Sequence, residues 1–356
     1  MESSCDKVYK LSLFNNCEVA SGKFEPYIHR SESLLTTNLC DNPHRLNVVT
    51  CKDEEIEYFI KEVDGLDFDI EINSEIPKLP NHFPTVDKRS ALKFQAPESI
   101  EFIGLTLIDI IKTGFVFKAK TLQKAGDITL EENLLKGSLK GKKVILFLTG
   151  EDMLIETVWH KRDSIKFFQI LSRMGFFAIT GFNFSVFGGE CAFSQHLNLK
   201  RSLFSSHLIE KHGMRAIPHV YFINDFQIQK WVKWFNNNPS VTCFVMNCQL
   251  IKENSEMLFL IKNLKRLLSL LKKDISVILQ GFQCDYIPFL RPYIDRIHFT
   301  DKTAVKDANQ KKKYELDIKN NRLIKIFQPH LTVEQIFKSN ILNRKMLIER
   351  KSSFKT

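Results

Sequence analysis

Several short motifs that identify common enzyme classes are missing from this sequence of 356 residues. No Gly-x-Gly-x-x-Gly or Walker loop follows an apolar run, and neither Gly-x-Ser-x-Gly, His-Glu-x-x-His nor the kinase motif set occurs. These motifs hold dinucleotides, nucleotide phosphates, a nucleophilic serine or a catalytic zinc ion. Their absence disfavours a Rossmann-type nucleotide site, a serine hydrolase, a zincin and a kinase.

Paired cysteines and long apolar runs are also lacking. Eight cysteines stand at 5, 17, 40, 51, 191, 243, 248 and 284, without any Cys-x-x-Cys pair, so a zinc ribbon or a redox motif is not indicated. Cys243 lies inside an apolar run, where a buried and reduced thiol is the usual state. No run approaches ~18 apolar residues, and the first residues carry no apolar signal segment. We expect a cytoplasmic protein without a membrane span.

The composition is that of a globular protein with an excess of positive charge. Hydrophobic residues make up 44% and charged residues 26%, and the formal net charge is +10. A positive net charge favours a polyanionic partner such as DNA or RNA. The alternative is a coding bias, because Lys, Asn, Ile and Phe are all abundant.

A repeated pattern between about residues 144 and 300 predicts the fold. Short apolar runs end in polar residues and are followed by amphipathic helical stretches, and the runs lie at 144–149, 176–180, 215–221, 241–246, 275–280 and 294–300. Their spacing of roughly 30 residues is that of one β-α-β unit, and continuous apolar strands are typical of parallel sheets covered by helices. We predict an α/β fold, a (β/α) barrel of the TIM type, with an open doubly wound sheet as the alternative.

The regions outside these runs predict the domain boundaries. We expect a small α+β appendage at 1–90, the barrel at 98–330 and a basic C-terminal helix at 331–356. The Pro-rich passage 76–84 marks the first boundary. Strands at 98–120 and 323–327 could complete the barrel, although 314–318 and 323–327 also resemble a hairpin. Thr332-Val-Glu-Gln335 matches a capping box and predicts the start of the last helix.

Candidate catalytic groups follow two of the predicted strands. The third run continues into His219, Tyr221, Asn224 and Asp225, and a histidine near an acid can carry out general acid–base chemistry. Glu190 follows the second run after two glycines. We assign the acid–base role to Asp225 or Glu190, assisted by His219. The alternatives are a helix cap for Asp225 and a core position for His219.

A second group of residues suggests phosphate binding. After Gly188-Gly189 a helix is predicted whose first turns carry His196, Lys200 and Arg201. Helix amino termini with nearby cations bind phosphate. These cations could equally lie on a solvated helix face.

Amide side chains end two of the runs and suggest recognition of a base or sugar. Asn247, Gln280 and Gln283 have this position, and Gly281 would let a ligand approach the backbone. His298 and Asp301 would join them at the same rim of the barrel. Trp234 could stack on a nucleic-acid base or pack in the core.

Part of the chain resembles known families. Gly181-Phe-Asn-Phe-Ser-Val-Phe187, His196-Leu-Asn-Leu-Lys-Arg-Ser202, Ile217-Pro-His-Val-Tyr221 and Asn247-Cys-Gln249 resemble an uncharacterised family of barrel-like proteins from phages and other mobile elements. That family has an Asp-Phe-Ser pattern where this chain has Asn183-Phe-Ser185, which argues against an acid role there. Val277-Ile-Leu-Gln-Gly-Phe-Gln283 is faintly similar to the tRNA-guanine transglycosylase barrels, whose Asp-Ser-Gly-Gly-Phe-Gln signature is absent. Base exchange is what that similarity implies, and Asp225 is then the candidate acidic group because of its position at a strand end rather than because of a motif.

The sequence therefore leads to three functional hypotheses. The first is an enzyme acting on a nucleic acid or nucleotide, by hydrolysis or base exchange, in a phage or defence context. The second is a non-catalytic subunit that binds nucleic acid or other protein subunits. The third is a barrel enzyme acting on a small phosphorylated metabolite. Cofactor and metal requirements stay open.

Overall fold

Eight parallel strands form the centre of the protein in the computed structural model, which describes residues 53–93, 97–118, 121–137, 139–186 and 192–353. In chain order they are β1 (His82–Pro84), β2 (Phe102–Thr106), β5 (Lys143–Phe147), β6 (Ala178–Thr180), β7 (Ala216–Ile217), β8 (Cys243–Asn247), β9 (Ser276–Gln280) and β10 (Ile297–Asp301). Each of the six predicted runs overlaps one of the last six strands.

The strands close into a barrel. Two four-stranded sheets, β1-β10-β9-β8 and β2-β5-β6-β7, are joined by single parallel bridges, Thr85 to Gly104 and His219 to Val245. Starting at Thr85 and stepping through the strand registers, the path returns to β1 at residue 77, eight residues before its start. Eight strands with a stagger of eight residues define the TIM barrel. The barrel prediction is confirmed, and the open sheet is excluded.

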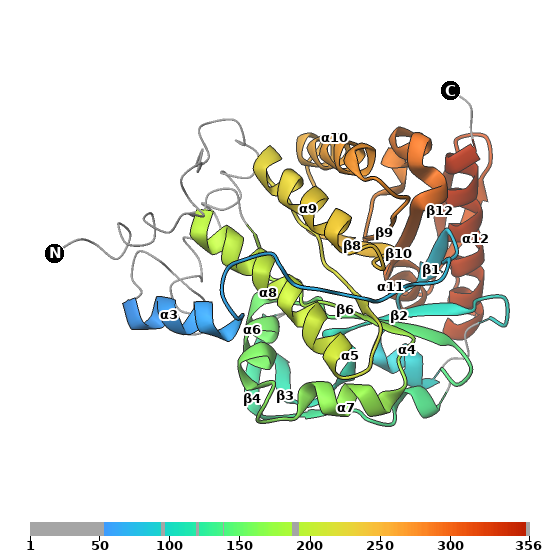
Figure 1. Ribbon diagram of the computed structural model, residues 1–356. Coiled ribbons are helices and arrows are strands. Elements are labelled where there is room, and N and C mark those ends of the chain that lie inside the picture. The colour runs from blue at the N-terminus through green and yellow to red at the C-terminus, as the bar shows by residue number, and fades with distance from the viewer. Residues whose placement is uncertain (1–52, 94–96, 119–120, 138, 187–191, 354–356) are drawn as a thin grey trace.

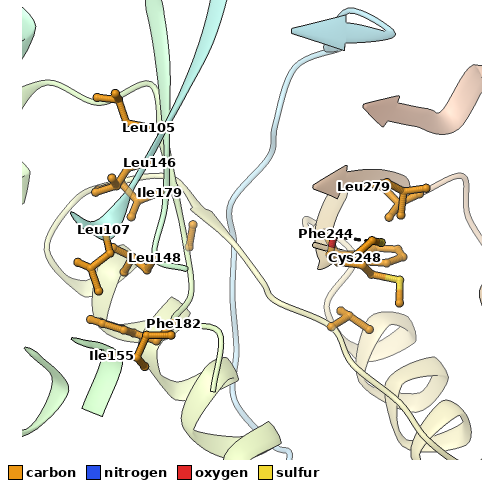
Figure 2. Close-up of a cluster of buried hydrophobic side chains, with 14 of the residues drawn as sticks. Leu105, Leu107, Leu146, Leu148, Ile155, Ile179, Phe182, Phe244, Cys248 and Leu279 are labelled. Carbon is orange, nitrogen blue, oxygen red and sulfur yellow. Dashed lines mark hydrogen bonds between the residues drawn. The ribbon is translucent and has the colours of Figure 1, made fainter. Parts of the chain in front are cut away.

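Two hydrophobic cores follow from the alternation of side chains along each strand. Outward residues pack against the helices, and Figure 2 shows Leu105, Leu146 and Ile179 in a row across β2, β5 and β6. Inward residues form a second, smaller core within the barrel, which includes Phe147 and Ile217. The strands are apolar on both faces because both faces are buried.

Helices follow each strand and surround the barrel (Figure 1). They are α4 (Lys88–Lys93), α5 (Leu107–Ile110), α6 (Asp152–Lys161), α7 (Phe167–Met174), α8 (Ala192–Lys211), α9 (Asp225–Asn237), α10 (Asn254–Leu270), the 3-10 segment η3 (Cys284–Arg296) and α11 (Thr303–Asn309). None of the described helices is long and apolar enough to cross a membrane.

An extended segment, residues 66–76, runs from α3 (Asp53–Glu62) across α8 and α9 to β1 (blue in Figure 1). Its side chains alternate between buried and exposed, as in a strand, but helix side chains satisfy its backbone. Trp234 Nε1 donates to the Ile70 carbonyl over 2.8 Å, and the Ile72 amide donates to Asn238 Oδ1 over 2.8 Å. Trp234 is therefore a core residue, and the base-stacking alternative is wrong.

The domain boundaries differ from the prediction at the N-terminal side. β1 lies within residues 1–90, because its register with β10 makes it the first barrel strand rather than part of an appendage. Of the two segments expected to complete the barrel, 98–120 supplies β2. Residues 323–327 do not, since they pair with a neighbouring strand in a hairpin.

Two hairpins and a long helix decorate the barrel. β3 (Ile111–Lys118) pairs with β4 (Thr121–Leu130), and β11 (Lys312–Asp317) pairs with β12 (Arg322–Phe327), both antiparallel. The last helix, α12 (Val333–Ser353), begins with the expected capping box. Gln335 Oε1 accepts the Thr332 amide over 2.9 Å, and the Gln335 amide donates to Thr332 Oγ1 over 3.2 Å.

Candidate ligand site at the carboxyl ends of the barrel strands

The inward side chains become more polar toward the carboxyl ends of the strands. In a barrel with this stagger, alternate strands contribute the four side chains of one layer. From the amino to the carboxyl ends, the strand registers give these layers: Phe102, Ala178, Cys243 and His298; Phe83, Ile145, Ile217 and Ile278; Gly104, Thr180, Val245 and Thr300; Thr85, Phe147, His219 and Gln280. The last two layers form the polar layers of the barrel.

Hydroxyl and amide groups in the polar layers bond to one another. Thr85 Oγ1 and Thr300 Oγ1 lie 2.7 Å apart, on adjacent strands. Gln280 Nε2 donates to Thr149 Oγ1 over 3.2 Å, which joins β9 to the residues just after β5 on the opposite wall. This bond shows that Gln280 points across the barrel rather than toward the helices.

Two atoms of the polar layers have no hydrogen-bond partner within the described part of the chain. They are His219 Nε2 and Gln280 Oε1, on side chains of residues that are 3% and 0% exposed. An unsatisfied buried polar atom costs about 1–3 kcal/mol. Such a cost is found at sites where a ligand supplies the missing partner.

His219 is neutral in this environment. Burial alone lowers the pKa of its imidazole from 6.5 to about 3. A neutral imidazole can donate a hydrogen bond from one ring nitrogen and accept one at the other. His219 therefore offers a ligand a directed hydrogen bond without charge.

Charged groups lie at the same end of the barrel, where β2 and β10 finish. Lys302 Nζ donates to Thr106 Oγ1 over 2.7 Å and to Asp109 Oδ2 over 2.9 Å. Thr106 and Asp109 are not among the site residues predicted from the sequence. The direction of Thr106 depends on where β2 begins and ends, which the sequence does not give. The alternation of β2, once its register is known, finds Thr106, and the capping-box spacing from Thr106 to Asp109 finds Asp109.

The predicted catalytic residues are not brought together. Asp225 is the first residue of α9, 53% exposed at its side chain, and it forms a 2.7 Å ion pair with Arg266 on α10. Neither Asp225 nor Arg266 belongs to the polar layers that hold His219. The helix cap is Asn224, whose side chain accepts the Gln227 amide over 2.9 Å. Glu190 lies outside the described residues.

The predicted phosphate-binding residues have partners inside the protein. Arg201 donates to both oxygens of Glu156, over 2.9 and 2.6 Å, and is 1% exposed. Lys200 Nζ donates to the Asp67 carbonyl, and His196 Nε2 lies 2.7 Å from the Leu66 carbonyl. These side chains contact the extended segment and α6, and phosphate binding by Lys200, Arg201 and His196 stays a prediction.

Of the three amide side chains predicted to recognise a base or sugar, two are neighbours and one is separate. Asn247 and Gln280 are register neighbours on β8 and β9, and Asn247 Oδ1 accepts the Gln249 amide over 3.0 Å. Gln283 is separate, since its Nε2 donates to the Ile251 carbonyl over 3.1 Å. Gly281, with a φ of +75°, gives room to Gln249 rather than to a ligand, because a Cβ there would lie 2.4 Å from Gln249 Cγ.

The two residues expected at the rim beside these amides lie elsewhere. His298 belongs to the layer at the amino end of the barrel, where its Nδ1 lies 3.1 Å from the Pro80 carbonyl. Asp301 points outward, and Arg344 of α12 donates to its Oδ2 over 3.0 Å. His298 is the second residue of β10 and therefore faces inward near the amino end of the barrel. Asp301 faces outward because side chains alternate along the strand.

No group of three or more potential metal ligands is found among the described residues. Neither a protein-family model nor a curated protein matches the chain. Among solved structures, it is similar to the tryptophan synthase alpha chain from Legionella pneumophila subsp. pneumophila. The identity is 9%, the match covers 83% of this chain and 98% of that chain, and the TM-score is 0.39. The fold assignment rests on the strand registers, which are independent of this comparison.

Proposed function

We propose that this protein is an enzyme acting on a small polar molecule bound in the polar layers of the barrel. The observation that carries the proposal is the pair of buried atoms without partners, His219 Nε2 and Gln280 Oε1. Barrel enzymes place their sites at this end of the strands. A ligand with a hydroxyl or amide N–H would satisfy Gln280 Oε1, and its oxygen or nitrogen would bond to His219.

The chemistry of the polar layers suits the polarisation of a carbonyl or hydroxyl group. A neutral histidine that donates a hydrogen bond to a carbonyl oxygen stabilises the negative charge that develops there during reaction. His219 has the required neutral state and burial. We assign His219 this role and assign Gln280 the orientation of the ligand.

A nucleic-acid substrate stays a prediction supported by the net charge of +10. The cations expected to hold phosphate, Lys200 and Arg201, are engaged within the protein. A small molecule fits the site better than a duplex or a long strand, because His219 and Gln280 are buried, with 3% and 0% of their surfaces exposed.

The first experiment is a thermal-shift screen of the full chain against polyols, amides, sugar phosphates, nucleosides and short oligonucleotides. The compound with the largest shift is then titrated against Gln280→Met, which removes the unpartnered oxygen with little change in volume. We expect at least a tenfold loss of affinity, the effect of ~1.4 kcal/mol. We also expect the unfolding free energy to change by less than about 1 kcal/mol, because the lost bond to Thr149 opposes the removal of the unsatisfied oxygen.

Gln283→Met is the matched control. This change removes the bond to the Ile251 carbonyl and should lower the unfolding free energy by about 1 kcal/mol without altering the affinity. The proposal fails if Gln280→Met destabilises the protein by more than ~2 kcal/mol and leaves ligand binding intact, since Gln280 would then be structural.

A further inference from the structure

Lys302 is held rigidly at the carboxyl end of the barrel. It follows β10, and its Nζ reaches across the end of β1 to Thr106 Oγ1 at the end of β2, over 2.7 Å. Its second bond, to Asp109 Oδ2, measures 2.9 Å. Surface lysines are ordinarily mobile, whereas two fixed acceptors restrict this ammonium to one position.

Asp109 is itself fully bonded. It is 4% exposed. Its Oδ1 accepts the Lys88 amide over 3.0 Å, and its Oδ2 accepts the Thr106 amide and hydroxyl over 2.8 and 2.6 Å. Because three other donors already stabilise the carboxylate, Lys302 is not needed to neutralise all of its charge.

The ammonium group keeps one donor for a ligand. It has three N–H groups, and two of them point to Thr106 and Asp109. The described residues provide no third acceptor, and the Lys302 side chain is 32% exposed. Thr106 continues the inward series Phe102 and Gly104 of β2, so the cluster lies at the carboxyl end of the barrel.

We propose that Lys302 binds an oxyanion, a carboxylate or phosphate group, on the molecule that occupies the polar layers. The inference rests on the proposed function and narrows its substrate class. The ligand has a neutral hydroxyl- or amide-bearing end, which reaches His219 and Gln280, and an anionic end, which meets Lys302. An ammonium donor forms its strongest hydrogen bonds with anionic oxygen.

Simple ions test this assignment without knowledge of the ligand. Sodium phosphate and sodium acetate are compared with sodium chloride at equal ionic strength, and the melting temperature of the full chain is measured. We expect a rise of about 2 °C or more for the wild type with at least one of the two oxyanions. Phosphate alone would indicate a phosphorylated ligand, and both ions would indicate any oxyanion.

Three variants locate the effect. Lys302→Gln should abolish the rise while its amide can still bond to Asp109, and Lys302→Arg should restore part of it. Lys142→Met is the control, because Lys142 Nζ donates to the Pro97 and Ile100 carbonyls at the opposite end of the barrel, over 3.0 and 2.8 Å. The inference is overturned if the wild type does not respond beyond chloride, or if Lys302→Gln responds as the wild type does.

The test separates this inference from the proposed function. Gln280→Met should keep the phosphate or acetate response, since within the described part of the chain no hydrogen bond joins Gln280 to Lys302. If the wild type shows no rise in melting temperature with phosphate or acetate but still binds the compound found in the screen, only the role of Lys302 is refuted. If the oxyanions raise the melting temperature but Gln280→Met binds the compound as tightly as the wild type does, only the ligand site in the polar layers is refuted.

Discussion

Arg201→Met should lower the unfolding free energy by about 3–5 kcal/mol, because it removes a buried guanidinium and its two charge-assisted hydrogen bonds to the buried Glu156 carboxylate. The Arg201 guanidinium forms two bonds to Glu156, lies 3.9 Å above the Phe184 ring, and lies 3.9 Å from Glu62 at the end of α3. This side chain therefore joins α3, α6 and α8. Urea denaturation at pH 7 measures the loss.

Arg266→Met is the control for this prediction. The Arg266–Asp225 pair has a similar 2.7 Å distance, but its side chains are 50% and 53% exposed. Exposed ion pairs contribute about 0–1 kcal/mol, so we expect a change within that range. The double variant Arg201→Met with Glu156→Met should recover much of the loss, since both members of the buried Arg201–Glu156 pair are then apolar.

A small effect of Arg201→Met on stability would contradict this account. Should the variant lose less than ~1 kcal/mol and also lose affinity for phosphate or nucleic acid, the functional role expected from the sequence would return.

Acid should destabilise the protein steeply between pH 6.5 and pH 4. Burial lowers the pKa of His196 to about 4, of His219 to about 3 and of His298 to about 4, all from 6.5. Lys230 and Lys200 lower the value for His196 further, and Lys78 lowers that for His298. The folded state thus holds three neutral histidines that the unfolded chain would protonate.

The direction follows from these values. Each histidine contributes its full stabilisation above pH 6.5 and loses it as the pH falls toward its folded-state pKa, because the unfolded chain takes up the proton first. Near pH 5 the three together should give a slope of about 3–4 kcal/mol per pH unit. Urea midpoints at pH 7, 6 and 5 measure this slope.

His196→Gln tests one contribution by itself. Its amide can still bond to the Leu66 carbonyl, and it does not titrate, so the slope should fall by about one third. Equal urea midpoints for the wild type from pH 7 to pH 5 would show that these histidines are not held neutral by the fold.

The fold was predictable because its signal is local. Six strands between residues 143 and 301 show as apolar runs, since strands buried on both faces need continuous apolar sequence. β1 was missed because its three residues, His82–Pro84, lie in a Pro-rich passage and join the barrel through pairing with β10 at the other end of the chain. No sequence pattern near residue 82 indicates that this segment pairs with β10.

The candidate site was predictable only in part. Three predicted residues were found from their positions at strand ends, and the structure places them toward the carboxyl end of the barrel: His219, Asn247 and Gln280. The burial of Arg201 and Lys200 was not predictable, because a basic helix face has the same sequence pattern whether solvent or another segment covers it. Glu62 and Asp67, which contact them, are more than 100 positions away in sequence.

The resemblance to barrel-like proteins of phages and mobile elements stays a prediction, as do DNA, RNA and protein-subunit partners. The neutral hydrogen-bonding groups of the polar layers give no reason to prefer a polymer over a small molecule. The proposed chemistry depends on His219 and Gln280, whichever setting the protein works in.

The most direct test of the ligand site is NMR of the protein labelled with ¹⁵N at histidine side chains. His219 and His298 both point into the barrel but lie in its opposite end layers, so His298 serves as an internal reference. With the compound found in the screen, we predict a shift of the His219 ring nitrogens and an unchanged His298. A bound compound that leaves His219 unchanged, or that shifts His298 instead, would contradict a ligand site at the carboxyl ends of the strands.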